Sequence, residues 1–135
     1  MINRVEKLSL LSEMIAFAKY DKDIKNIEYN FLLGVAKQLD ISRSDFEYLI
    51  EHPVTYTHLK SHSERIVQFH RLVLLMNIES CNNTNNKGVI KLYNFGLRMG
   101  LSHESITKVL YLMDSFPNKI VPPDVLIDIF KTQYN

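Results

Sequence analysis

The sequence predicts an all-α fold, a single domain of about seven helices in two halves related by a pseudo-twofold axis. Apolar residues recur at intervals of three and four, the spacing that places side chains on one face of a helix. No segment alternates apolar and polar residues for long enough to indicate a strand. The chain has 135 residues, the size of one ordinary domain, and its four Gly and four Pro are few for a fold of many tight turns.

The first half of the chain predicts three helices, over residues 5–20, 26–40 and 42–52. Ser42 and Asp45 resemble a capping box that opens the third helix. Pro53 ends it, because the residue before a proline avoids the helical region. The apolar faces comprise Leu8, Leu11, Ile15 and Ala18, with Leu10, Met14 and Phe17 beside them, then Leu32, Val35, Ala36 and Leu39, and then Phe46, Leu49 and Ile50.

The second half predicts four helices, over residues 63–76, 87–99, 102–113 and 123–132. Ser61 and Ser102 offer caps, and Pro123 takes the first position of the last helix, where proline is well tolerated. The expected buried positions are Ile66, Phe69, Leu72, Val73 and Met76, then Val89, Leu92, Tyr93 and Gly96, and then Ile106, Val109, Leu110 and Met113.

The two halves form an internal repeat over residues 5–50 and 63–113, followed by the C-terminal helix within the same domain of residues 1–135. The clearest correspondence joins Leu39-Asp-Ile-Ser42 to Met99-Gly-Leu-Ser102, at an offset of sixty residues. Helix lengths and the capped junction agree as well as the apolar stripes. At the same offset, Leu32, Val35 and Ala36 align with Leu92, Phe95 and Gly96.

The segment between the first two helices resembles the TerB-like family, named for a tellurite-resistance protein. The family's loop usually reads Asp-Gly-x-Ile-Ser-x-x-Glu, and here it reads Asp21-Lys-Asp-Ile-Lys-Asn-Ile-Glu28, before a helix that ends in Leu-x-Ile-Ser. Lys22 replaces the Gly that relaxes the turn, and Lys25 replaces the capping Ser. The resemblance implies a duplicated helical bundle, a binding or scaffold role in bacterial stress-response systems, and a divalent-metal site in the acidic loop.

Asp21, Asp23 and Glu28 are the candidate metal ligands. Calcium and magnesium prefer several oxygen ligands from a short loop, and an Asp-x-Asp start supplies two of them. The further ligands, central Gly and terminal Glu of an EF-hand loop are missing. Two interpretations stay open: a weak calcium or magnesium site, or a helix cap made by Glu28 beside two solvated turn residues.

A zinc site is a further hypothesis, because four of the five His lie between residues 52 and 70. His58 and His62 are four residues apart, as in helical zinc sites, and His70 lies eight residues further on. The Glu that follows the first His of a metalloprotease helix is absent. The single Cys, Cys81, has no partner for an internal disulfide, which is typical of a reducing compartment.

Lys87, Lys91 and Arg98 line up along one predicted helix as a candidate anion-binding or partner-binding face. The alternative is an ordinary solvated face. The formal net charge of +1 gives no general attraction to nucleic acid, and we expect no specific nucleic-acid partner. Four aromatic residues near the C-terminus are expected mostly in the core, with a homodimer contact as the alternative: Tyr111, Phe116, Phe130 and Tyr134.

No phosphate-binding loop, nucleophile elbow or paired Cys motif points to catalysis. We therefore expect a non-enzymatic interaction module, and the TerB-like resemblance implies a stress-response system with a protein partner that is membrane-associated in some members of that family. The alternatives are a cation sensor at the acidic loop and a zinc enzyme using the His cluster. Since no signal peptide or membrane-spanning segment is recognisable, we expect a soluble, cytoplasmic protein.

Overall fold

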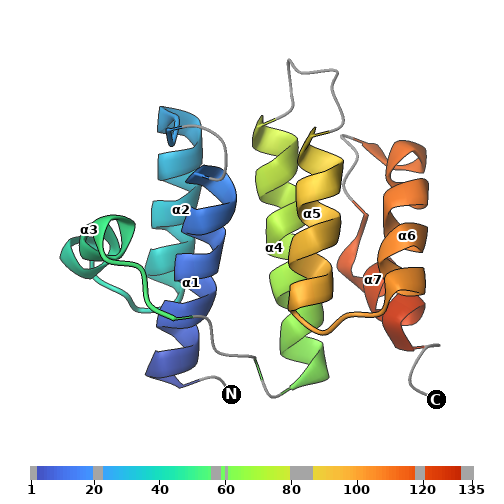
Figure 1. Cartoon of the computed structure of the whole chain (residues 1–135), viewed down its shortest axis with the longest axis horizontal. Coiled ribbons are helices and arrows are strands. Elements are labelled where there is room, and N and C mark those ends of the chain that lie inside the picture. The colour runs from blue at the N-terminus through green and yellow to red at the C-terminus, as the bar shows by residue number, and fades with distance from the viewer. Residues whose placement is uncertain are drawn as a thin grey trace. The chain divides into compact units, whose positions relative to one another are not determined.

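The computed structural model describes residues 3–19, 23–55, 59, 61–79, 87–117 and 121–131. Over these residues the chain forms seven α-helices and one short 3-10 helix, and no strand (Figure 1). The predicted all-α class and helix number are therefore confirmed. The chain divides into two compact units, Met1–His58 and Leu59–Asn135, so the division falls between the two predicted repeats. The pseudo-twofold arrangement stays a prediction.

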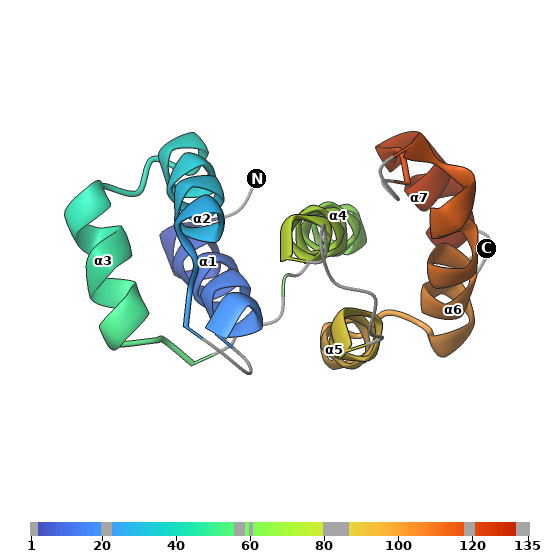
Figure 2. The same cartoon turned by 90° about the horizontal axis from the view of Figure 1, so that it is seen from above.

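The first unit contains α1 (Arg4–Lys19), α2 (Asn26–Gln38) and α3 (Arg43–Glu51), and each helix packs against the other two. The helices α1 and α2 lie side by side in both views of Figures 1 and 2. The buried apolar side chains of this unit include Leu10, Leu11, Met14, Ile15, Phe17 and Ala18 from α1, Leu32, Val35 and Ala36 from α2, and Phe46 and Leu49 from α3.

Hydrogen bonds between side chains and backbone N–H groups fix where α1 and α2 begin. The start of α1 has a reciprocal capping box, and the start of α2 has one bond of the same kind. At α1, the Asn3 side chain accepts a hydrogen bond from the Glu6 backbone N–H at 2.8 Å, and the Glu6 carboxylate accepts from the Asn3 N–H at 3.2 Å. At α2, the Glu28 carboxylate accepts from the Lys25 N–H at 2.9 Å. These bonds satisfy backbone donors that have no partner within a helix. The box at Asn3 was not predicted from the sequence.

The second unit contains α4 (His62–Glu79), α5 (Lys87–Arg98), α6 (His103–Leu112) with the 3-10 turn η1 (Met113–Ser115), and α7 (Pro123–Lys131). Both α4 and α6 pack against α5 and against α7, which closes a ring of four helices. Phe69 of α4 meets Phe130 of α7 edge to face, with ring centroids 5.8 Å apart. Other buried apolar residues are Leu72, Val73, Leu75 and Met76 from α4, Leu92 and Phe95 from α5, Ile106 and Val109 from α6, and Leu126 and Ile129 from α7.

The junction between α2 and α3 is a Schellman turn followed by a serine cap. Asp40 adopts a positive φ of 59°, its N–H donates to the Lys37 carbonyl, and the Ile41 N–H donates to the Ala36 carbonyl. The hydroxyl of Ser42 then accepts from the Asp45 N–H at 3.2 Å and opens α3. The chain thus turns from one helix into the next within four residues.

The junction between α5 and α6 repeats this arrangement bond for bond, sixty residues later. Gly100 has a φ of 86°, its N–H donates to the Leu97 carbonyl, and the Leu101 N–H donates to the Gly96 carbonyl. The hydroxyl of Ser102 accepts from the Ser105 N–H at 3.1 Å. Each residue from 32 to 41 also has the same degree of burial, buried, half-buried or exposed, as its counterpart from 92 to 101. The two junctions therefore share one local hydrogen-bonding arrangement.

Candidate functional site

The acidic segment before α2 is described only in part, because Asp21 lies outside the described residues. Asp23 is exposed. Glu28 is fully buried, and its Oε1 holds the Lys25 backbone N–H. Glu28 therefore makes the helix cap that the sequence offered as one of two interpretations. Over the described residues, no group of three or more His, Cys, Asp and Glu side chains is arranged to hold a metal ion.

The His cluster is spread along α4. His58 lies outside the described residues, His62 is the first residue of α4, and His70 follows eight residues later. Eight helical residues span about 12 Å along the axis, whereas zinc ligands lie about 2 Å from the metal. His62 and His70 therefore do not ligate the same ion.

Burial changes the protonation of both α4 histidines. The pKa of His62 is lowered first by burial and then by the Arg65 guanidinium, and a hydrogen bond to the Phe130 backbone carbonyl partly opposes this. The pKa of His70 is lowered by burial and by the neighbouring Arg71. The Nε2 atom of His70 is buried without a hydrogen-bond partner. The neutral imidazole is thus the form that the folded state favours.

The basic residues of α5 lie on one side of the helix but differ in burial. Lys87 is the first residue of α5, Lys91 is buried, and Arg98 is exposed at the last turn. The Arg98 guanidinium lies over the Phe95 ring, 4.4 Å from its centroid, in a cation–π contact. Lys91 and Arg98 therefore do not form one continuous exposed row.

An exposed apolar row on α5 is the feature that the sequence did not reveal. Ile90 is 59% exposed and Leu97 is 41% exposed, seven residues apart on one side of the helix, with the exposed Asn94 between them. Val89, predicted as buried, is 38% exposed beside Ile90. The buried face of α5 is instead made by Leu92, Phe95, Gly96 and the buried Lys91. Because the apolar residues of α5 cover more than half of its circumference, periodicity alone did not show which of them would be buried.

The two equivalent positions of α2 are polar, although the same side of that helix also carries Ile27, which is 57% exposed. At the offset of sixty residues that aligns the two Schellman turns, Ile90 and Leu97 correspond to Asn30 and Lys37, which are also exposed. These two positions thus hold an amide and an ammonium group in α2 and two aliphatic side chains in α5. All four residues are exposed. The fold does not require aliphatic residues at these positions.

The C-terminal aromatic residues differ from the prediction of a mostly buried set. Phe130 is buried, Phe116 is half-buried, and Tyr134 lies outside the described residues. Tyr111 is 82% exposed, so its assignment to the core is wrong. Tyr111 follows Leu110 on α6, and the helix turns its Ile106 and Val109 side inward instead.

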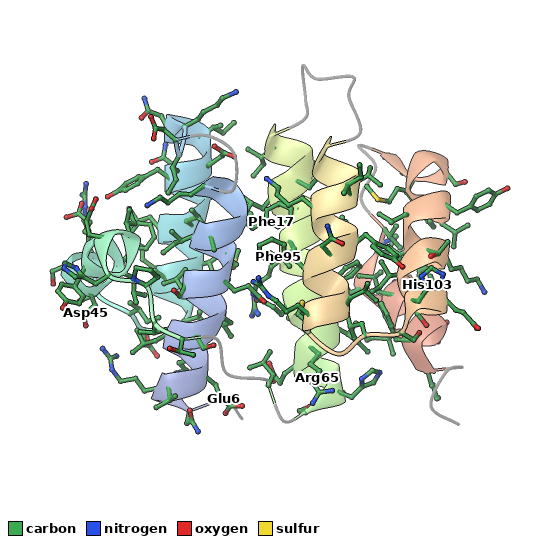
Figure 3. The ribbon with its side chains drawn as sticks, in the orientation of Figure 1. Glu6, Phe17, Asp45, Arg65, Phe95 and His103 are labelled. Carbon is green, nitrogen blue, oxygen red and sulfur yellow. The ribbon has the colours of Figure 1, made fainter. Side chains whose placement is uncertain are left out.

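A hydrogen bond joins the middle of α5 to the start of α6 near the exposed row. The Tyr93 hydroxyl is bonded to Nδ1 of His103, the first residue of α6, and the two rings meet edge to face with centroids 5.5 Å apart. Figure 3 labels His103 on α6. Tyr93 is half-buried and lies one turn from Leu97. This contact helps to fix the orientation of α5 relative to α6, and hence the position of the row.

Comparisons with known proteins add no relative: no protein-family model, curated protein or solved structure matches the chain. Over the residues that the structure describes, no helix is both long enough and apolar enough to cross a membrane.

Proposed function

We propose that this protein is a non-enzymatic interaction module that binds a protein partner through the exposed apolar row of α5. The observation that carries the proposal is the difference between α5 and α2. Ile90 and Leu97 occupy positions that are polar in the equivalent helix, at the same exposure. Aliphatic side chains gain free energy when a partner removes them from water.

The helix that carries the row packs closely against its neighbours. The Gly96 side of α5 packs closely against α4 and α6: a Cβ atom at this position would meet Ile106 Cδ1 at 2.8 Å and Phe69 Cε1 at 3.0 Å. The Schellman turn at Gly100 and the Tyr93–His103 bond fix the end of the helix. A rigid helix presenting a few apolar side chains loses little conformational entropy on binding.

The resemblance to the TerB-like family extends the proposal to a scaffold role in a bacterial stress-response system. Its short loop motif supports this extension, with Asp21, Ile24 and Glu28 in the family's spacing. The duplicated helix–turn–helix junction is consistent with the duplicated plan that the resemblance implies.

The test replaces the row with polar residues of the kind found on α2. An Ile90→Asn, Leu97→Gln variant is compared with wild type and with Ile127→Asn, which changes a side chain of α7 that is 47% exposed. Proteins captured from a lysate of the source organism are quantified for each. At least one protein should be retained by wild type and by Ile127→Asn and should fall about tenfold or more with the row variant.

Thermal unfolding of the three proteins controls for folding, because exposed substitutions change stability little. If the row variant retains the same captured proteins as wild type at the same levels, the row is not a binding surface and the proposal is wrong.

A further inference from the structure

The exposed side of α3 carries an aromatic ring that is already held in place. Tyr48 is 62% exposed, and its ring stacks on the His52 imidazole with centroids 4.1 Å apart and an interplanar angle of 14°. His52 follows the last residue of α3, and its backbone N–H donates to the Tyr48 carbonyl at 2.8 Å. Its Nδ1–H donates to the same carbonyl at 3.3 Å. The imidazole therefore supports one face of the Tyr48 ring and leaves much of the ring open to solvent.

The acidic residues of α3 differ in whether they are already paired. Asp45 binds the Arg4 guanidinium at 2.9 Å, and Glu47 Oε1 lies 3.5 Å from Arg43 Nε. Glu51 is exposed, and over the residues that the structure describes no hydrogen bond or ion pair involves its carboxylate. One carboxylate of α3 is thus available to a group from outside the chain.

The end of α3 favours positive charge. Glu51 is the last residue of the helix, where the backbone carbonyls carry partial negative charge, and the last turn contains no basic residue. The Lys19 ammonium of α1 donates to the Ile50 carbonyl at 3.2 Å, which agrees with this preference. Because residues three apart are neighbours on a helix surface, the free carboxylate of Glu51 emerges beside the Tyr48 ring.

An aromatic ring beside a carboxylate is best suited to a guanidinium group. The planar group can stack on the ring in a cation–π contact while its N–H groups donate to the carboxylate. An ammonium group is compact and strongly hydrated, so it fits this pair of contacts less well. A nucleobase would also stack on Tyr48, but the phosphates that accompany it would be repelled by Glu47 and Glu51.

A second copy of the chain has no unused guanidinium to offer. Each arginine of the sequence already has a partner within the chain. The partners are a carboxylate for Arg4 and Arg43, a backbone carbonyl for Arg65, a side-chain amide for Arg71 and an aromatic ring for Arg98. The group that binds at the end of α3 therefore comes from a different protein.

We propose that the C-terminal end of α3 is a second docking surface, where an arginine side chain of a partner protein stacks on Tyr48 and pairs with Glu51. This surface belongs to the first unit and uses a different helix from the α5 row. It stands or fails independently of the function proposed for that row.

The test titrates the whole ¹⁵N-labelled protein with N-acetylarginine amide and, at the same ionic strength, with N-acetyllysine amide. Amide shifts in the NMR spectrum locate the binding. The arginine probe should shift residues 47–52 with a dissociation constant of about 50 mM, the value expected for one exposed cation–π contact and one exposed ion pair. The lysine probe should bind about threefold more weakly.

Four variants test the two contacts separately. Tyr48→Leu should weaken binding of the arginine probe about fivefold, and Glu51→Gln about threefold. Tyr48→Phe keeps the aromatic ring and should bind like wild type. Tyr111→Leu removes an exposed tyrosine of α6 and is the matched control, which should also bind like wild type. The same spectra report whether each variant is folded.

Three results would overturn the inference. The first is an absence of shifts at residues 47–52 up to about 100 mM arginine probe, or equal shifts with both probes. The second is arginine binding that Tyr48→Leu and Glu51→Gln leave unchanged. The third is a different occupant: shifts of the same residues by adenosine monophosphate without any by the arginine probe, or a dimer in sedimentation that Tyr48→Leu abolishes.

Discussion

The α2–α3 and α5–α6 segments share one backbone arrangement and use it differently. Both end the first helix with a Schellman turn and open the second with a serine cap, and their burial agrees at every aligned position from 32–41 to 92–101. They differ at two aligned positions, where α2–α3 has Ala36 and Asp40 and α5–α6 has Gly96 and Gly100. They also differ in the residues of the exposed face. The comparison teaches that local hydrogen bonding sets the turn, while individual side chains set how closely the helices pack and what the surface can bind.

The largest expected effect tests the close packing at Gly96. Gly96→Ala should lower the free energy of unfolding by about 2 kcal/mol, because the new methyl group would overlap Ile106 and Phe69. Gly34→Ala is the matched control: it lies in α2 with no atom within 4 Å of the new Cβ, and it should stabilise by up to about 1 kcal/mol.

Chemical denaturation of the two variants measures both changes. Stabilisation by Gly96→Ala would show that α5 and α6 have room for a methyl group and that the difference from Ala36 has no packing role.

A smaller effect is expected at the left-handed residues of the two turns. Gly100→Ala should destabilise by about 1 kcal/mol, because a side chain is disfavoured at its φ of 86°. Asp40→Gly, at a φ of 59°, should change stability in the opposite direction by up to about 1 kcal/mol. Calorimetry of both variants checks the pair. If the two substitutions shift the melting temperature in the same direction, the two turns are not energetically equivalent.

The smallest expected effect is a pH dependence of stability caused by His62 and His70 of the second unit. The folded state lowers the pKa of His62 and His70, so the unfolded chain binds protons first as the pH falls through the ordinary histidine value of 6.5. Stability should therefore be constant above about pH 7.5 and decrease as the pH drops below about 6.5. His70→Gln should reduce this slope, and His62→Gln, His70→Gln should reduce it further. An unchanged slope in the double variant would show that other groups cause it.

Much of the fold could be predicted from the sequence because its signals are local. Ser42, Ser61 and Ser102 mark helix starts through bonds to backbone groups three residues away, and all three cap as predicted. Pro123 begins α7, and the apolar stripe of α4 is buried as expected. Each of these signals depends on a few neighbouring residues, so the distant parts of the chain do not change it.

The candidate site was predicted less well. Asp23 and Glu28 were singled out for their carboxylates, and the structure shows Glu28 engaged at a cap. Lys91 was placed on a stripe with Arg98 and is buried. The exposed Ile90 and Leu97 were missed, because the apolar residues of α5 cover more than half of its circumference and only the neighbouring helices decide which of them are buried.

The sequence by itself determined the all-α class, the helix boundaries and the repeated turn at residues 39–42 and 99–102, because backbone hydrogen bonds and capping act within one or two turns. Only the tertiary structure decided that Tyr111 and the α5 row face solvent, that α5 meets α6 closely at Gly96, and that burial lowers the pKa of His70. Burial and close contact depend on which helices meet, and residues far apart in the chain decide that.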